Sequence, residues 1–427
     1  MMATGSRSFD IAVVGAGMVG AATAALLARC GFSVLLVEAR SPQAFDPGLA
    51  VGLRVSAISP GSAAILEQAG AWAEIETSRS CAYRRMHIED QAGEHQGEDQ
   101  GEDARNTAGM DFEARAFGME RLGTIVENEL TQSALWHAVE ANPLVHILCP
   151  AALLEIEQDA DSAVLVLVDG ERFEVALVIG ADGANSGVRN AAGIFQDTWE
   201  YNQKGLVCVV RKARHNPGVA WQRFLPGGPL AFLPLSDGSS SIVWTLPASE
   251  ADRLASISRD AFQAELDAAS HGWLGQVLDC GPRATFPLIM RLSERYVSGR
   301  VVLLGDAAHV VHPLAGQGVN LGLADAAALT EVLVESRSAG NAIADRRVLR
   351  KFERWRKSES ELMAGGIHGL RALFLPPALA GLRGLGLNMV SRNWPLKEVL
   401  LRRAAGLGRN APRISRGASL QSLAHRP

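Results

Sequence analysis

The chain has 427 residues, which is enough for one large domain or two medium-sized domains with sizeable cores. Its formal net charge of −5 gives no reason to expect a nucleic-acid partner. The five cysteines are scattered and form no CxxC pair, so neither a metal site nor a disulfide framework is indicated, and a cytoplasmic protein is expected.

The first predicted elements form a strand–helix–strand unit. Residues 9–14 read as a buried strand, residues 18–30 as an alanine-rich helix and residues 33–37 as a second strand. The apolar run 11–28 also resembles a signal peptide or membrane span, but it has no basic region before it. The glycine spacing within the run favours the first βαβ unit of a parallel sheet.

A dinucleotide fingerprint lies within this unit. Gly15 permits the tight turn after the strand, Gly17 lets the backbone approach a pyrophosphate, and Gly20 lets helix and strand pack closely. Glu38 follows eighteen residues after Gly20, where a carboxylate accepts hydrogen bonds from ribose hydroxyls and disfavours a 2′-phosphate. The pattern therefore predicts FAD or NAD rather than NADP.

The remaining elements change in character along the chain. A short helix is predicted at 61–70, an acidic solvated loop at 93–109 and a helix at 124–141. Short β-type runs separated by turns then predict a mixed or antiparallel sheet: 206–210, 221–225, 231–235 and 241–246. A strand and a helix return at 300–304 and 318–334, and 345–408 reads as helices with breaks near Pro376, Pro377 and Pro395.

A second motif follows the predicted strand 300–304. Asp306 is placed to accept a hydrogen bond from a ribityl hydroxyl, while Gly316 and Gly318 allow the backbone to approach a flat ring. A helix starting near Gly318 would direct its positive end at the flavin N1 and C2 carbonyl. The complete run predicts a flavin site: Gly305-Asp306-Ala307-Ala308-His309, Pro313 and Gly316-Gln317-Gly318-Val319-Asn320.

A third motif, within residues 178–189, lies between these two and by itself reads as a strand and turn. The three motifs in this order resemble the single-component, FAD-dependent aromatic hydroxylases. That resemblance implies that Asp182, Gly183 and Arg189 lie near the FAD pyrophosphate and take part in the use of the pyridine nucleotide.

Further segments narrow the resemblance to the hydroxylases of ubiquinone biosynthesis, over about residues 8–405. These segments are residues 53–59, 81–86, 125–128, 134–136 and 231–235. The resemblance implies that Arg54 and Asn128 contact FAD, and Asn320, the last residue of the flavin motif, is also expected to bind it. The acidic 93–109 stretch departs from the family pattern. It lies in a peripheral segment, so it puts the expected contacts with partner proteins in doubt more than the expected reaction.

The implied activity is hydroxylation of a polyprenylated phenol or benzoquinol through a flavin C4a-hydroperoxide. It requires O₂ as co-substrate and NADPH or NADH as electron donor. The loop of Pro313, Gly316, Gln317 and Gly318 is expected to orient the peroxide, and no base is assigned. His309 and His312 are open to two interpretations, as phenol-deprotonating bases or as packing residues, and packing is favoured.

The fold expected from these observations is α/β: a Rossmann-type FAD-binding domain with an inserted β-rich substrate domain and a helical C-terminal segment. The FAD-binding domain is expected at 8–80, 116–195 and 291–340. The substrate domain is expected at 81–115 and 196–290, and the C-terminal helical region at 341–427.

The C-terminal region mixes many leucines with interleaved arginines. Such a pattern favours packing or homo-oligomer formation, with peripheral contact at the inner face of the membrane as the alternative. Other ubiquinone-biosynthesis proteins are expected as partners. Two other functions stay open: hydroxylation of a small aromatic or secondary metabolite, and a weakly catalytic flavoprotein assembly subunit.

Overall fold

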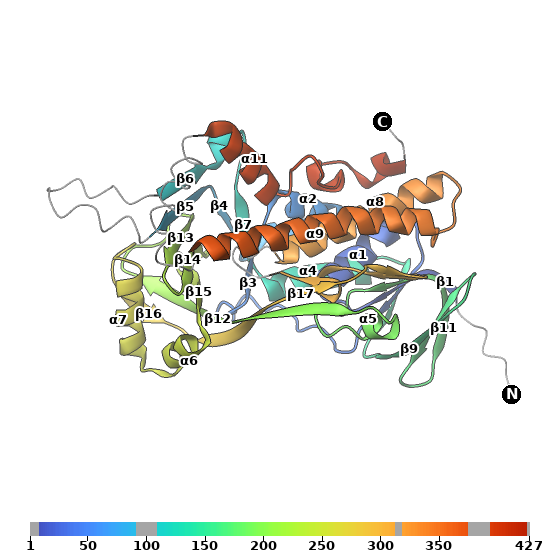
Figure 1. The fold of residues 1–427 in the computed structure, drawn as a ribbon, viewed down its shortest axis with the longest axis horizontal. Helices are drawn as coiled ribbons and strands as arrows, with labels where there is room; N and C mark the ends of the chain where they lie inside the picture. The colour runs from blue at the N-terminus through green and yellow to red at the C-terminus, as the bar shows by residue number, and fades with distance from the viewer. Residues whose placement is uncertain (1–7, 91–108, 312–317, 375–392, 425–427) are drawn as a thin grey trace.

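A computed structural model describes residues 8–90, 109–311, 318–374 and 393–424. Two large sheets and a small third one make up its β structure, and helices pack on and between them (Figure 1). In the view of Figure 1 the first sheet lies on the right, the second extends to the left, and the long helix α9 runs along their upper side.

The first sheet has the parallel core expected of a dinucleotide-binding domain. Its parallel strands lie in the order β19-β11-β1-β2-β8. Their bounds are β1 Ser8–Val14, β2 Val34–Val37, β8 Val145–Leu148, β11 Arg172–Gly180 and β19 Val301–Leu303. Antiparallel strands extend it: β9 Leu153–Gln158, β10 Ala163–Leu167 and β18 Val297–Ser298. Three helices pack together beside it: α1 Met18–Arg29, α4 Asn128–Glu140 and α8 Gly318–Ser338.

The second sheet confirms the short β-type runs predicted in the middle of the chain. Its order is β20-β17-β12-β15-β14-β13-β5-β6, with β16 also paired to β12. The central strands are β12 Gln196–Lys212, β13 Val219–Leu225, β14 Gly228–Pro234 and β15 Ser240–Pro247. The others are β5 Arg85–Asp90, β6 Gly109–Glu113, β16 Val277–Cys280, β17 Ala284–Ser293 and β20 His309–Val310. Helices α6 Ala248–Ser256 and α7 Arg259–Ala269 share a hydrophobic core with one face of this sheet.

The third sheet corrects the helix predicted at 124–141. Its order is β3-β7-β4, with bounds β3 Val55–Ile58, β7 Gly123–Glu127 and β4 Cys81–Tyr83. The helix α4 starts only at Asn128, because the five residues before it form a fully buried strand between two partners. The β-branched run Thr124-Ile125-Val126 suits such a strand, and tertiary pairing outweighs its helix-like apolar spacing.

The remaining helices are mostly short. They are α2 Pro60–Ala69, α3 Trp72–Thr77, η2 Ala114–Phe117, α5 Gly187–Ala191, η3 Gly305–Ala307, α9 Arg346–Phe374, α11 Trp394–Ala404, η5 Ile414–Arg416 and η6 Leu420–Ala424. The break predicted near Pro395 coincides with the start of α11: Asn393 is its N-cap with extended backbone, and Pro395 occupies the first turn, where a proline is tolerated. The predicted acidic loop, except Gly109, and the break at Pro376 and Pro377 lie outside the described residues.

The search for membrane spans covered the described residues, and within them no helix combines the length and apolarity needed to cross a bilayer.

Candidate functional site

The glycine-rich turn between β1 and α1 has the geometry that the fingerprint predicts. Gly15 has φ +96°, and an added Cβ would lie 2.5 Å from the Ala181 carbonyl oxygen. A Cβ on Gly20 would lie 1.8 Å from the Gly15 carbonyl oxygen, so both positions require glycine. Gly17 differs, since no atom lies within 4 Å of its virtual Cβ. The backbone at Gly17 is therefore open to a ligand on that side.

The N-terminus of α1 is suited to an anion. Gly17 is the N-cap residue, no side chain caps the helix, and its first turn contains no acidic residue. The free N–H groups and the positive end of the helix dipole favour a phosphate here.

Two polar side chains hold this turn. Glu38, just after β2, accepts hydrogen bonds from the Ala16 N–H at 2.6 Å and from the Arg40 N–H at 3.0 Å. Gln132 on α4 donates to the Ala16 carbonyl. Sequence reasoning missed Gln132, because a polar residue in an amphipathic helix gives no signal that it reaches another motif. The Glu38 carboxylate retains lone pairs for a ribose hydroxyl.

Asp306 lies in η3 and lines a cavity. Its side chain retains accessible surface toward that cavity. The surrounding protein desolvates the carboxyl and raises its pKa, although the charges of His309 and Arg54 act in the opposite direction. A hydrogen bond from a hydroxyl group in the cavity would stabilise the ionised carboxylate in such a position.

A buried network holds the segment that carries Asp306. Asp325 on α8 is fully buried and accepts from the Gly305 N–H at 3.0 Å and from His309 Nε2 at 2.6 Å. Its other oxygen accepts from Arg356 Nε of α9 at 2.6 Å. His309 is 2% exposed, which confirms the interpretation that it packs inside the motif. Asp325 is a second residue that sequence reasoning missed. An acidic residue within the apolar predicted helix 318–334 was the feature that could have indicated it.

The central motif is tied to the same segment. Asp182 accepts from the Ser186 hydroxyl at 2.5 Å and from the Val188 N–H at 3.0 Å, which fixes the start of α5. Arg189 is buried and donates to the carbonyls of Ala184 and Ala307, both at 3.1 Å. Arg189 therefore connects the central motif to the segment that follows β19. Gly183 has φ +81°, open space at its virtual Cβ and a place in the cavity wall.

Arg54 and Asn128 lie side by side in the wall of the same cavity. The Asn128 N–H donates to the Arg54 carbonyl at 2.9 Å, and Asn128 Oδ1 accepts from the Ser56 hydroxyl at 2.6 Å. Both residues line the cavity. The Arg54 side chain is exposed toward it and acts electrostatically on Asp306.

Asn320 on α8 bridges two segments. Its amide donates to the Ala57 carbonyl at 2.8 Å and accepts from the Ser59 N–H at 2.9 Å. Gly318, also predicted from the motif, is the first residue of α8 and lines the cavity. Pro313, Gly316, Gln317 and His312 lie outside the described residues.

The cavity that these residues share has a volume of about 610 Å³. One part is formed by the motif residues Gly17, Arg54, Asn128, Asp306 and Gly318. The other is formed by one face of the second sheet, including Val207, Ala220, Ala231, Leu233, Val243 and Phe286. The structure thus joins a polar, glycine-rich site to an apolar chamber, an arrangement suited to a cofactor and an apolar substrate side by side.

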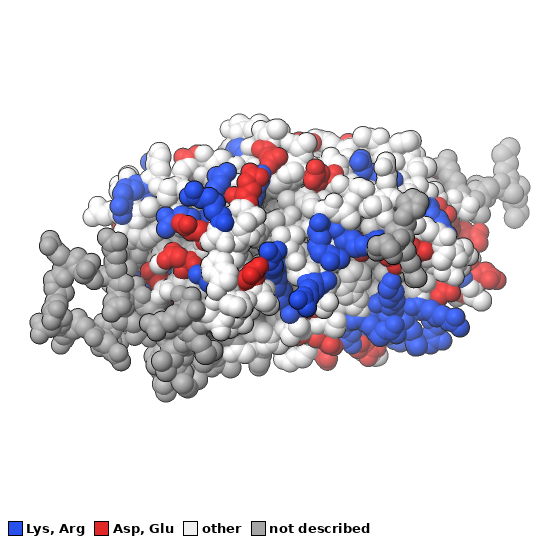
Figure 2. All heavy atoms as spheres, turned by 90° about the horizontal axis from the view of Figure 1, so that it is seen from above, with Lys and Arg blue, Asp and Glu red and all other residues white. Residues whose placement is uncertain are grey.

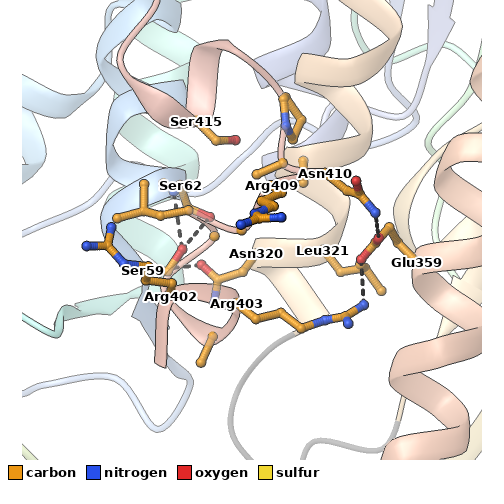
Figure 3. A pocket seen from close by; sticks show the side chains of 18 of the residues that line it. Ser59, Ser62, Asn320, Leu321, Glu359, Arg402, Arg403, Arg409, Asn410 and Ser415 are labelled. Atoms are coloured by element: carbon orange, nitrogen blue, oxygen red, sulfur yellow. Dashed lines mark hydrogen bonds and ion pairs between the residues drawn. The ribbon is translucent and has the colours of Figure 1, made fainter. Parts of the chain in front are cut away.

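A second cavity of about 790 Å³ lies between α2, α8, α9, α11 and the segment that follows α11 (Figure 3). Arg403 pairs with Glu359 at 2.8 Å across it, and Asn410 contacts the same carboxylate at 3.4 Å. Ser59 and Ala404 line both cavities and form a common wall, and Asn320 lines the second. On the face shown in Figure 2, several groups of basic side chains alternate with acidic ones.

The residues present fit an adenine dinucleotide with a flavin. Gly17, Gly183 and Gly318 all have open space where a Cβ would stand, so the backbone can lie against a bound group. Glu38 and the α1 N-terminus are placed for the ribose and the phosphates, and Asp306 for a polyol hydroxyl.

Comparison with known proteins gives consistent similarities. The model of the FAD binding domain family matches residues 8–358. A 3-demethoxyubiquinol 3-hydroxylase of Escherichia coli (strain K12) is 39% identical over 402 residues, covering 93% of this chain and 98% of the relative. The human mitochondrial ubiquinone biosynthesis monooxygenase COQ6 is 33% identical over 453 residues, covering 92% of each chain.

Solved structures show the same fold. A p-nitrophenol 4-monooxygenase from Pseudomonas putida DLL-E4 superposes with a TM-score of 0.73 at 20% identity, covering 94% of this chain and 99% of that one.

Proposed function

From the premise that the chain belongs to the FAD binding domain family and is a FAD-dependent monooxygenase, we propose a specific reaction. The protein hydroxylates the ring of a polyprenylated phenol or benzoquinol intermediate of ubiquinone biosynthesis. The observation that carries this proposal is the continuous cavity in which the flavin-motif residues meet an apolar sheet face. Relatives that cover nearly the whole chain and are named for such hydroxylations support it.

The chain's own residues divide the binding of FAD among them. The α1 N-terminus and Gly17 receive the pyrophosphate, Glu38 the adenosine ribose and Asp306 the ribityl chain. Arg54 and Asn128 flank the flavin from the cavity wall, and the N-terminus of α8 at Gly318 faces it. Bound and reduced, FAD supplies the electrons that activate O₂; NADPH or NADH is the proposed donor.

The apolar chamber performs the second task, which is to hold the ring and exclude water. Its sheet face carries short aliphatic side chains that leave room for a flat ring. Among the described residues that line this cavity there is no histidine. Tyr83 lines it, but burial raises the pKa of its phenol to about 12, so it stays protonated at neutral pH. We therefore propose catalysis by positioning, without a protein base.

The C-terminal helices provide a proposed contact surface. The helix α11 exposes Trp394, Val399 and Leu400 beside the basic residues Arg402 and Arg403. This composition supports contact with a second copy of the chain or with the inner face of the membrane, where a prenylated substrate would be met.

The test begins with the purified holoenzyme and a demethoxyubiquinol carrying a short isoprenoid tail. We expect the probe to stimulate NADPH oxidation and O₂ uptake, and the product to gain one oxygen atom from ¹⁸O₂. FAD binding without stimulated O₂ uptake would favour an assembly subunit instead.

Quinone profiling in a strain that lacks the gene gives the independent check. Accumulation of one under-hydroxylated prenylated intermediate would support the proposal and identify the ring carbon. An unchanged quinone pool in a strain without a redundant hydroxylase would favour a small aromatic or secondary metabolite as substrate.

A further inference from the structure

The sheet face of the substrate chamber contains one side chain that differs from its neighbours. Adjacent strands place Gln222, Ala231, Val243 and Val207 in one row across β13, β14, β15 and β12. All four line the cavity. Three are small aliphatic side chains, whereas Gln222 brings a primary carboxamide into this apolar surface.

The direction of Gln222 follows from the alternation of side chains along β13. Its neighbours Trp221 and Arg223 lie on the opposite face, where Trp221 stacks on Trp273 at 5.2 Å and Arg223 donates to the Ala269 carbonyl. Gln222 therefore projects into the chamber that holds Asp306 at its other end.

The carboxamide of Gln222 faces the cavity and is not paired with another side chain or with the backbone among the described residues. The residue is only 9% exposed, its side chain makes no hydrogen bond with the described residues, and its amide atoms are not among the fully buried unpaired ones, so they stay accessible from the cavity. Most polar side chains with so little exposure are paired within the protein, so an amide left open to a cavity is available to a ligand there. Another glutamine of the same sheet shows the usual situation: Gln203 is 8% exposed and donates to the Gly227 carbonyl at 3.0 Å.

We infer that Gln222 determines substrate specificity by hydrogen bonding an uncharged oxygen substituent of the aromatic ring. This assignment rests on the proposed function and specifies how its substrate is recognised. A carboxamide both donates and accepts, so it matches a phenol hydroxyl or a ring methoxy oxygen.

The charges around the chamber restrict the ligand further. None of the described residues that the second sheet contributes to the cavity wall is charged. The described charged residues of the whole wall are Arg54 and Asp306, and both stand at the flavin-motif end. A ring carboxylate would thus lack a cation at the sheet, which favours a neutral phenol or quinol over a benzoate.

The first test measures binding through the flavin absorbance of the holoenzyme. The probes are 2-methoxy-6-(3-methylbut-2-enyl)phenol and two analogues, one without the hydroxyl and one without the methoxy group. We expect the wild type to bind one analogue about tenfold more weakly than the parent probe. The near-isosteric variant Gln222→Met should bind the parent probe about tenfold more weakly and no longer distinguish that analogue. Equal discrimination in wild type and variant would overturn the assignment.

The second test needs no ligand and uses a matched substitution. Gln222→Met removes an amide that has no hydrogen-bond partner among the described residues, so it should leave the urea midpoint of the protein unchanged or raise it. Gln203→Met removes a paired one and should lower the midpoint while leaving probe discrimination intact. A Gln222→Met midpoint that falls as far as that of Gln203→Met would show that Gln222 is a structural residue.

The two tests separate failure of this assignment from failure of the proposed function. If the wild type binds none of the three probes, the proposed function is wrong and this assignment falls with it. If the wild type binds the parent probe and turns it over, but Gln222→Met discriminates as the wild type does, only the assignment to Gln222 is wrong.

Discussion

Replacing Asp325 tests how the buried network supports the flavin site. Asp325 is 0% exposed, and its two oxygens are bonded to Arg356, His309 and the Gly305 N–H. Arg356 and His309 are themselves only 3% and 2% exposed. The variant Asp325→Ala leaves a guanidinium and an imidazole inside the protein without their common acceptor, and it frees the backbone before Asp306.

The magnitude follows from the burial of the pair. Removing one partner of a buried ion pair costs about 3–5 kcal/mol, because the remaining charge stays desolvated. This is a large part of a typical unfolding free energy of about 5–15 kcal/mol. Asp325→Asn keeps the shape and one acceptor oxygen, so we expect a smaller loss of about 1.5–3 kcal/mol, the range for a hydrogen bond to a charged group.

The pH dependence has a defined sign. Burial by itself raises the pKa of Asp325, but His309 and Arg356 outweigh it and hold the pKa below its ordinary value of 3.8. A carboxyl with a depressed pKa stabilises the fold above its unfolded pKa, and this contribution is lost as the pH falls through the folded value. The wild type should lose stability below about pH 4, and this component should be missing in Asp325→Asn.

The assay is urea unfolding of the FAD-free protein at pH 7 and pH 3, followed by measurement of FAD retention after gel filtration at pH 7. The matched control is Asp252→Asn, which removes a surface ion pair to Lys204 and should cost no more than about 1 kcal/mol. A loss below about 1 kcal/mol for Asp325→Ala would refute the reasoning, because it would mean that the buried charges find other partners.

Three further predictions concern the cofactor residues. Gly17→Ala should fold normally and retain FAD poorly, since its Cβ enters open space at the phosphate site. Gly20→Ala should instead impair folding, because its Cβ meets the Gly15 carbonyl. Circular dichroism and flavin content distinguish the two variants. Asp306→Asn should raise the stability of the FAD-free protein at pH 7, because a carboxyl with a raised pKa destabilises the fold when it ionises above about pH 4. The same variant should retain FAD less well. A stability gain that persists at pH 3 would contradict the proposed cause. Glu38→Gln should lower FAD affinity by about tenfold in fluorescence titration, through the loss of a charged acceptor for the ribose; unchanged affinity would remove Glu38 from the site.

The sequence by itself determined those features that depend on local pattern. Gly15 and Gly20 could be assigned because a tight turn and a close helix–strand contact each exclude a Cβ wherever the turn occurs. Short β-type runs separated by turns predicted the central strands of the second sheet, and motif order indicated the family. The individual contacts of these residues with FAD and the domain boundaries stay predictions.

Tertiary structure alone decided which distant residues meet. The strand β7 was misread as part of a helix because its pairing partners β3 and β4 stand far away in the chain. Asp325 and Gln222 gave little signal, since the neighbouring sequence does not reveal whether a polar side chain is paired in the fold. In the folded protein, Arg356 and His309 pair with Asp325, whereas Gln222 faces the cavity. Local sequence sets the conformation of each element, whereas burial and partnership arise only when the elements pack.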